Sequence, residues 1–158
     1  MRSFLDRANM VLATGFGLGL SPVASGTAGT LPGFLLVLAT GRLPLPGEIA
    51  AAVLLALVAI PICDRAERVL GRKDDGRIVA DEYLTFPLCL LGLPREPWVL
   101  AMAFVTARFF DVVKPPPARQ LQALRGGLGV VIDDVFAALY SLATNWVIYW
   151  AVAKVWLS

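Results

Sequence analysis

The sequence predicts an all-α integral membrane protein built from several short or broken helices. Hydrophobic residues make up 58% of its 158 residues and charged residues only 16%, against about 45–50% and about 25% in soluble domains. Acidic and basic side chains gather in three short blocks, 64–82, 108–125 and 133–134, which apolar stretches separate. Carboxylates beside membrane-embedded helices are costly unless they are paired, hydrated or bound to metal. We therefore expect these carboxylates to have a functional role.

Five apolar segments define the expected helices of a single domain over residues 1–158. Proline stands at or near the ends of the first four, and a pair of aspartates precedes the fifth. Only the last has the roughly 20 residues of a full membrane span. The shorter helices therefore either extend into the polar blocks or are re-entrant or interfacial. The segments are 28–41, 49–63, 83–93, 98–107 and 135–153.

The distribution of Lys and Arg predicts the orientation, because loops on the cytoplasmic side carry an excess of these residues. If all five segments cross, only Arg42, Arg95 and Lys154 of the 14 basic residues fall on one side. The opposite side is then cytoplasmic, and the polar motifs described below fall on it. We therefore expect a functional site at the cytoplasmic face.

Composition also excludes several classes of protein. The chain has no histidine, which excludes phosphohistidine chemistry, a Ser-His-Asp triad and histidine-bound metals. Its net charge is only +2, and no basic run with interleaved aromatics indicates a nucleic-acid partner. Cys63 and Cys89 lie in apolar runs and are expected to be buried, reduced thiols.

The first motif is a loop rich in glycine and hydroxyl groups, GFGLGLSP followed by SGTAGT, over 15–22 and 25–30. Such a loop can present backbone N–H groups and hydroxyls to a phosphate, although it lacks the ending of a P-loop. It could equally be a helix-packing segment in which Ser25 or Thr27 caps a helix. The residues alone leave the two interpretations open.

The second and fourth motifs are acidic. DDGRIVADE (74–82) places Asp81 and Glu82 against an apolar helix, and GGLGVVIDD (126–134) leads a second carboxylate pair into the last apolar segment. Two ionised carboxylates buried without a partner would be strongly unfavourable, and oxygen ligands of this kind suit Mg²⁺. The alternative is that these acids cap their helices.

The third motif is RFFDVVKPPPAR (108–119). Arg108, Asp111 and Lys114 stand three residues apart, so on a helix they form one slanted strip, which Pro115 then ends. Arg offers a planar fork for phosphate and Lys a point charge. The strip is therefore either a phosphate clamp or a membrane-edge helix with snorkelling bases and a local ion pair.

Taken together and in this order, the four motifs closely resemble the phosphatidylglycerophosphatase A family, the Mg²⁺-dependent membrane lipid phosphatases of bacteria. The resemblance covers residues 15–134. It implies a multi-pass protein of the bacterial inner membrane, with its active site at the cytoplasmic face. It also implies hydrolysis of phosphatidylglycerophosphate to phosphatidylglycerol and inorganic phosphate, with membrane lipids as partners and an oligomeric state left open.

The resemblance implies that these motif residues match the family's acidic, basic and hydroxyl-rich positions, and from this we expect the following roles. The acids Asp81, Glu82, Asp133, Asp134 and Asp74 would hold Mg²⁺, and Asp111 would join the first four in catalysis. The substrate phosphate would be bound by Arg108, Lys114, Arg119, Ser21, Gly26, Thr27 and Thr30.

The chain departs from the family pattern at several positions, none of which removes a motif acid or base. A Pro-Gly-Thr becomes Ser25-Gly26-Thr27, and a Gly-Ser becomes Gly29-Thr30. A histidine becomes Asp75, so that position is not expected to be essential, and a tryptophan of the KPWP run becomes Pro116.

Three alternatives remain at this point. A CDP-alcohol phosphatidyltransferase would need Ala-Arg after Asp75-Gly76, which is absent. A non-catalytic or divergent membrane protein, binding or transporting ions or lipids, would place polar residues at mid-span. Within the phosphatase interpretation, either a metal-bound water or a carboxylate could attack phosphorus.

Overall fold

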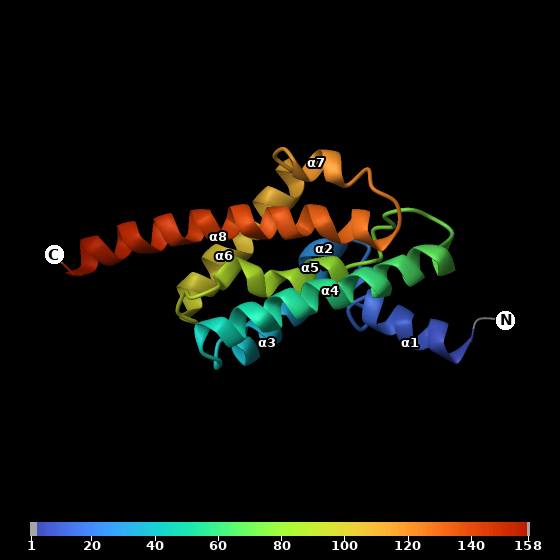
Figure 1. Ribbon diagram of the computed structural model, residues 1–158, viewed down its shortest axis with the longest axis horizontal. Coiled ribbons are helices and arrows are strands. Elements are labelled where there is room, and N and C mark those ends of the chain that lie inside the picture. The colour runs from blue at the N-terminus through green and yellow to red at the C-terminus, as the bar shows by residue number, and fades with distance from the viewer. Residues whose placement is uncertain (1–2, 158) are drawn as a thin grey trace.

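The computed structural model describes residues 3–157, and within this range the chain forms helices and no strand (Figure 1). Two short 3₁₀ helices, η1 and η2, interrupt the α-helices. In chain order the elements are α1 (Phe4–Ala13), η1 (Leu18–Leu20), α2 (Ser25–Gly29), α3 (Leu31–Thr40), α4 (Leu45–Leu70), α5 (Ala80–Thr85), η2 (Phe86–Leu90), α6 (Pro97–Val113), α7 (Ala118–Leu121) and α8 (Gly127–Leu157).

Among the residues that the structure describes, two helices are long and apolar enough to cross a bilayer, α4 and, within α8, Gly127–Val155. They lie side by side (Figure 1), and glycine at the start of α8 allows their backbones to touch. A Cβ atom on Gly127 would lie 2.6 Å from the amide nitrogen of Asp64 and closer still to the carbonyl oxygen of Ile60. The amide of Gly127 instead donates to Oδ1 of Asp64 at 3.3 Å.

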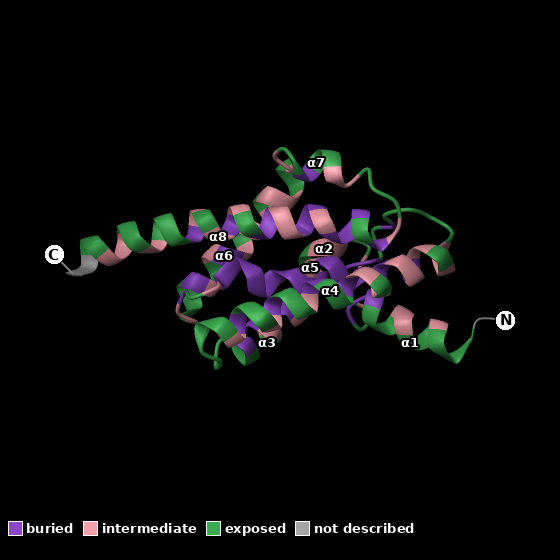
Figure 2. Cartoon of the chain, viewed as in Figure 1, coloured by how far each residue is buried: buried purple, intermediate pink, exposed green. Residues whose placement is uncertain are grey.

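The apolar segment 83–93 does not form a span of its own. It is divided into the end of α5 and the 3₁₀ helix η2, which contains Pro87. Residues 83–90 are all buried. In Figure 2 this stretch is the purple strip at the centre of the molecule. The other helices enclose it, so these apolar residues form the core.

The remaining apolar segments are longer or more divided than their hydrophobic stretches. Segment 49–63 lies inside α4, and segment 98–107 lies inside α6, so both helices do extend into the polar blocks. Segment 28–41 is divided between the end of α2 and α3.

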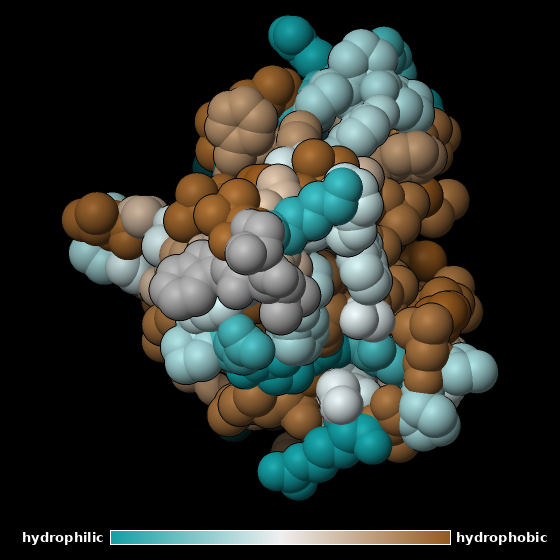
Figure 3. Space-filling view, turned by 90° about the vertical axis from the view of Figure 1, so that its left-hand side faces the viewer, coloured by the Kyte–Doolittle hydropathy of each residue, from teal (hydrophilic) through white to brown (hydrophobic). Residues whose placement is uncertain are grey.

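Different loops and helix ends lie at the two ends of the molecule. The loop between α3 and α4, the loop between η2 and α6, and the C-terminal end of α8 lie at one end, on the left of Figure 1. The loop after α4 and helix α1 lie at the other. Seen from the left-hand end, hydrophobic side chains make up much of the outline, with small hydrophilic groups between them (Figure 3).

A buried ion pair fastens the left-hand end together. Arg95 pairs with Glu48 near the start of α4, and its guanidinium also donates to the carbonyl oxygen of Leu90 at 2.7 Å. The second carboxylate oxygen of Glu48 accepts the amide of Gly92 at 3.1 Å. Glu48 is only 4% exposed, so a pair that sequence analysis did not identify joins α4 to the chain before α6.

Candidate active site

A polar cleft forms where α2, α5, α8 and the end of α6 meet. It encloses about 710 Å³ of empty space, including its open mouth. Carboxylates from four separate stretches of sequence converge on it, together with one lysine. Its lining residues are Ser25, Asp74, Gly76, Ile78, Asp81, Glu82, Asp111, Val112, Lys114, Asp133 and Asp134.

The two acidic pairs lie inside helices and do not cap them. The residue before α5 is Val79, so Asp81 and Glu82 belong to the first turn. Helix α8 begins at Gly127, which places Asp133 and Asp134 in its second turn. These two aspartates are 3% and 6% exposed. The capping alternative is therefore wrong for both pairs, and their burial needs another explanation.

Arg108 and Lys114 lie among these carboxylates. The guanidinium of Arg108 bridges Glu82 at 3.0 Å and Asp111 at 2.9 Å. The ammonium of Lys114 lies 2.6 Å from Asp133 and 3.8 Å from Asp111. The strip predicted from the three-residue spacing is thus present, and α6 ends at Val113 just before Pro115. Lys114 itself adopts a left-handed conformation, with φ of 46°.

The acids of α5 are short of compensating charge. Burial raises the pKa of Asp81 well above its ordinary value, and the charges of Glu82 and Asp133 add to the effect. Burial also raises the pKa of Glu82 to about 7, although the Arg108 guanidinium opposes the shift. Burial would lower the pKa of Lys114, but the hydrogen bond and charge of Asp133 outweigh it and raise the pKa. The cleft thus holds more negative charge than Lys114 and the neighbouring Arg108 neutralise.

The donor set suits a hard divalent cation. Oδ1 of Asp81 and Oδ1 of Asp133 are buried and have no hydrogen-bond partner, and such atoms are costly unless something binds them. Among the described residues, however, no three acidic or cysteine side chains are already arranged to hold a metal ion. Glu82, Asp111 and Asp133 are each turned toward a cation instead. The carboxylate oxygens are thus the right type of ligand for such a cation, but these side chains would have to rearrange to bind it.

The glycine- and hydroxyl-rich loop contributes to the site through part of its length. The hydroxyl of Thr30 donates to Glu82 at 3.1 Å, and Ser25 lines the cleft. A Cβ atom on Gly26 would lie 2.5 Å from both Arg108 and Glu82, so glycine is what lets this ion pair approach the backbone. The residue before α2 is Ala24 and makes no side-chain cap, so neither Ser25 nor Thr27 caps this helix.

Of the seven residues expected to bind phosphate, only Lys114 lines the cleft itself. Arg108, Gly26 and Thr30 adjoin Glu82 beside it, whereas Ser21, Thr27 and Arg119 make other contacts or are exposed. Ser21 donates its hydroxyl to the carbonyl oxygen of Val23 at 2.8 Å. Thr27 is exposed, and Arg119 is exposed on α7. Proline residues after Lys114 redirect the chain before Arg119, so spacing along one helix does not extend to it.

The acidic loop before α5 is divided between two positions. Asp74 lies at the cleft, where its carboxylate accepts the side-chain amide of Gln122 at 2.7 Å. Asp75 is buried and pairs with Arg77 at 2.7 Å. Hydrogen bonds from Arg77 lower the pKa of Asp75 to about 2. Asp75 therefore serves the loop structure and is not part of the cleft.

Sequence reasoning missed a second pocket, of about 260 Å³ including its open side, that shares Glu82, Asp111 and Asp134 with the cleft and is also lined by Arg108. Beyond these charged residues and the hydroxyl groups of Thr30 and Thr85 its wall is apolar, and the alanines of α6 and α8 leave the space. No sequence motif indicates that these alanines line a pocket, because alanine is common throughout helices. The apolar part is formed by Phe86, Cys89, Ala107, Ala137 and Ala138.

Cys89 and Arg95 have the six-residue separation found in the phosphate loops of cysteine phosphatases. The structure gives them no such role, because Cys89 is 1% exposed and a buried thiol is a poor nucleophile. Arg95 pairs with Glu48 at the other end of the molecule. The acidic cleft is the site that the geometry supports.

Comparison with known proteins identifies the family of the chain. The model of the family described as phosphatidylglycerophosphatase A matches residues 11–149. A Haemophilus influenzae protein named phosphatidylglycerophosphatase A is 37% identical over 89% of this chain and 88% of its own length. The Escherichia coli protein of the same name is 34% identical over 83% of this chain and 77% of its own length.

A third relative carries a different name. A Bacteroides thetaiotaomicron protein named "Putative phosphatidylinositol-3-phosphatase" is 35% identical over 90% of this chain and 94% of its own length. No solved structure matches the chain. The family match spans the cleft and most of the helices around it, and the chain belongs to the phosphatidylglycerophosphatase A family of phosphatases.

Proposed function

We propose that this protein is a Mg²⁺-dependent lipid phosphatase that hydrolyses phosphatidylglycerophosphate to phosphatidylglycerol and inorganic phosphate. The observation that carries the proposal is the convergence of Asp81, Glu82, Asp133 and Asp134 with Lys114 on one cleft, beside which Arg108 pairs with Glu82. The names of two relatives supply the substrate.

Asp81, Glu82, Asp133 and Asp134 would hold the metal, with Asp74 at the mouth as a further oxygen donor. When bound, Mg²⁺ would neutralise charge on the phosphoryl group and lower the pKa of a coordinated water. The partnerless oxygens of Asp81 and Asp133 support this assignment. The ion pair of Glu82 with Arg108 and that of Asp133 with Lys114 would have to loosen for Mg²⁺ to bind.

Arg108 and Lys114 are the groups that would orient the phosphate. Arg108 already makes two charged contacts with its planar fork, and a phosphate presents the same kind of oxygen acceptors as the carboxylates it now bridges. Asp111 contacts both cations, so it would keep them in place when Glu82 or Asp133 turns away. Asp111 thus acts on the substrate through these two residues.

Two routes for the displacement remain compatible with this cleft. A water could attack phosphorus in line while the glycerol oxygen leaves, or a carboxylate could attack and form an acyl phosphate. Trapping of phosphate-labelled protein would favour the covalent route. Direct transfer of labelled water oxygen into phosphate, without trapped protein, would favour the other.

The membrane placement is part of the same proposal. We place α4 and α8 across the inner membrane of a bacterium, with the cleft toward the cytoplasmic face. Their length and hydropathy support spanning. The two loops and the helix end that carry Arg42, Arg95 and Lys154 share one end of the molecule (Figure 1), as the positive-inside rule requires of the outer side. A lipid headgroup can then reach the acids while its tails stay in the bilayer.

The test is release of inorganic phosphate by the purified protein in lipid nanodiscs, with Mg²⁺ or with EDTA. Phosphatidylglycerophosphate, phosphatidic acid and phosphatidylinositol 3-phosphate are compared at equal surface concentration. The last is included because of the name of the Bacteroides relative. We expect Mg²⁺-dependent release that is fastest from phosphatidylglycerophosphate.

If phosphate release is fastest from phosphatidylinositol 3-phosphate, that lipid replaces phosphatidylglycerophosphate as the proposed substrate. No release from any of the three lipids, by protein that is monodisperse and helical, would support the non-catalytic alternative of a membrane protein that binds ions or lipids.

A further inference from the structure

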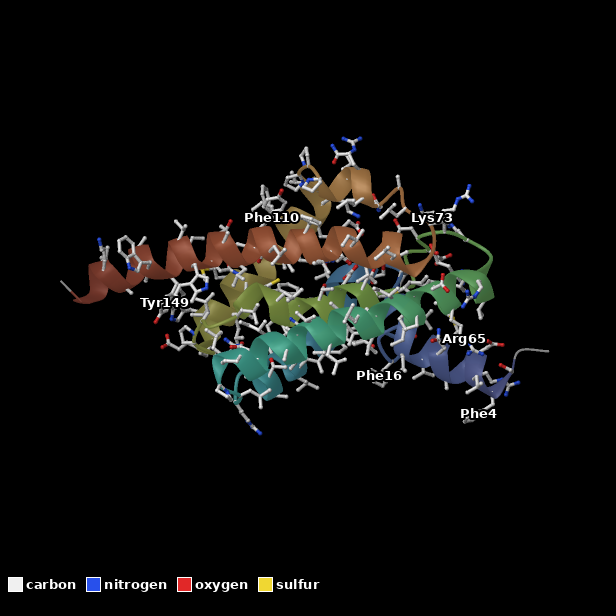
Figure 4. All side chains as sticks on the ribbon, viewed as in Figure 1. Phe4, Phe16, Arg65, Lys73, Phe110 and Tyr149 are labelled. Atoms are coloured by element: carbon white, nitrogen blue, oxygen red, sulfur yellow. The ribbon has the colours of Figure 1, made fainter. Side chains whose placement is uncertain are left out.

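Helix α1 is amphipathic in the opposite sense from a helix of a soluble protein. Its polar residues Asp6 and Asn9 are turned toward α4. Asp6 pairs with Arg65 at 2.9 Å, and the side-chain amide of Asn9 donates to the carbonyl oxygen of Ile62 at 3.0 Å. Figure 4 shows Arg65 between the two helices. The polar face is therefore occupied within the molecule.

The apolar face of α1 points outward. Phe4 is 82% exposed, and in Figure 4 its ring points away from α4 and the rest of the bundle. The same outward surface continues along the helix over several aliphatic side chains that are all exposed. These are Leu5, Ala8, Val11 and Leu12.

The chain after α1 extends this apolar surface at a cost in backbone strain. Phe16 has a φ of 59°, a left-handed conformation that is unfavourable for a bulky side chain. Its ring is 66% exposed and points to the same side as Phe4 (Figure 4). Leu20 and Val23 are exposed as well. A strained turn that presents an aromatic ring outward indicates an apolar environment on that side.

We propose that α1 and the loop through Val23 lie in the cytoplasmic interface of the bilayer, with the apolar face in contact with lipid. Two further observations identify lipid as the partner. Helix α1 packs against α4, whose exposed side chains Val53, Leu54 and Leu57 belong to a helix that can cross a membrane. Arg7 and Arg68 are exposed on α1 and on the polar part of α4, where they would meet anionic headgroups.

This placement connects the membrane surface to the cleft. The carbonyl oxygen of Ala13 accepts the amide of Val79 at 2.8 Å, and that of Leu12 accepts the Tyr83 hydroxyl at 3.0 Å. Both partners flank Asp81 and Glu82 in sequence. An interfacial α1 therefore fixes the depth of the acidic segment relative to the headgroups. The inference goes beyond the proposed function and needs neither the metal nor the substrate, although it shares the assumption that α4 lies in a bilayer.

The experiment is spin labelling of full-chain variants that each carry one added cysteine, in vesicles of phosphatidylethanolamine and phosphatidylglycerol. Labels at Leu5→Cys, Val11→Cys and Phe16→Cys report on the apolar face, and Arg7→Cys is the matched control on the same helix. Native Cys63 and Cys89 are buried and stay in place. Collision with oxygen is compared with collision with a water-soluble nickel complex.

We expect the three apolar-face labels to prefer oxygen, with positive depth values, and the Arg7→Cys label to prefer the nickel complex. Equal access of nickel to all four labels would overturn the inference. So would spin–spin broadening at Val11→Cys that vanishes on dilution with unlabelled protein, because a second copy would then cover the face.

A label at Leu54→Cys separates this inference from the proposed membrane placement. Leu54 is 61% exposed on α4. If its label is deep in the bilayer while the α1 labels meet water, only the inference about α1 fails. If its label also meets water, the membrane placement in the proposed function fails with it.

Discussion

At the scale of single residues, Asp133 contacts the lysine of the site and also has an oxygen free to bind a metal. One of its oxygens lies 2.6 Å from the Lys114 ammonium, and the other is buried without a hydrogen-bond partner. A buried carboxylate that is only half satisfied is costly. The arrangement is best explained if the second oxygen has a ligand to bind during the reaction.

Asp133→Asn is therefore expected to abolish phosphate release, because an amide neither carries the charge nor binds Mg²⁺ well. The matched control is Asp64→Asn, which changes an acid on α4 that the cleft does not include and leaves a carbonyl oxygen for the Gly127 amide. Phosphate release and thermal unfolding are measured for both variants. Near-normal turnover in Asp133→Asn would remove this residue from the site.

A second substitution distinguishes two arginines that the motif alone treats alike. Arg108 bridges Glu82 and Asp111, whereas Arg119 is exposed on α7. Arg108→Lys keeps the charge but loses the two-pronged contact, so we expect kcat/KM to fall about 10²-fold. Arg119→Lys should change it less than about 3-fold, since only an exposed surface charge is involved. Equal losses in the two variants would contradict the structural assignment.

These residues also show how far local spacing predicts the site. The positions of Arg108, Asp111 and Lys114 follow from helical geometry and were predictable. Arg119 was not, because the prolines after Lys114 change the direction of the chain and no spacing rule applies beyond them. The contact of Thr30 with Glu82 joins residues 52 apart, which only the tertiary fold brings together.

At the scale of elements, the start of α8 determines where the second acidic pair lies. Gly126 and Gly127 meet α4 beside Asp64, and Gly126 has a φ of 68°. Asp133 and Asp134 follow two turns later on the same rigid helix. The depth of the acids in the cleft therefore depends on this close approach of two backbones.

Gly127→Ala should destabilise the protein by about 1–3 kcal/mol, because the added methyl group would overlap the α4 backbone. Gly47→Ala is the matched control, since a Cβ there would be no closer than 3.4 Å to any neighbour and alanine favours a helix by up to about 1 kcal/mol. The measurement is the midpoint of thermal unfolding in detergent. An unchanged midpoint for Gly127→Ala would show that the helices are not packed as described.

The elements differ in how well the sequence predicts them. Segments 49–63 and 98–107 were identified as helices, and extension into the polar blocks was one of the alternatives left open. The extension of 98–107 follows from the three-residue spacing of its charges, whereas no such spacing predicts the polar turns that end α4 at Leu70. Segment 83–93 reads as one apolar run, yet it forms α5 and η2. Hydrophobicity does not distinguish a core element enclosed by other helices from a segment that faces lipid.

At the scale of the whole molecule, the asymmetry of charge and the arrangement of the helices support each other. The loops that carry Arg42 and Arg95 lie at the end of the molecule where α8 finishes, and α1 and the loop after α4 lie at the other (Figure 1). Figure 4 places Lys73 in that loop, where its ammonium donates to the carbonyl oxygen of Gln122 at 3.0 Å. The polar connections beside the cleft are thus held together.

This asymmetry predicts the labelling of two cysteine variants in intact cells. Arg42→Cys should react with a membrane-impermeant maleimide from outside the inner membrane, and Arg72→Cys should react only after the membrane is opened. Both residues are exposed, so burial does not limit the reaction. Reaction of Arg72→Cys in sealed cells, with Arg42→Cys protected, would reverse the proposed orientation.

The most direct test of the central claim is binding of Mn²⁺, a paramagnetic substitute for Mg²⁺, measured by electron paramagnetic resonance on the protein in nanodiscs. The account predicts saturable Mn²⁺ binding that Mg²⁺ displaces and that Asp81→Asn or Asp133→Asn weakens at least about tenfold, while Asp64→Asn binds normally. Undiminished binding in both cleft variants, or no saturable binding to the native chain, would contradict it.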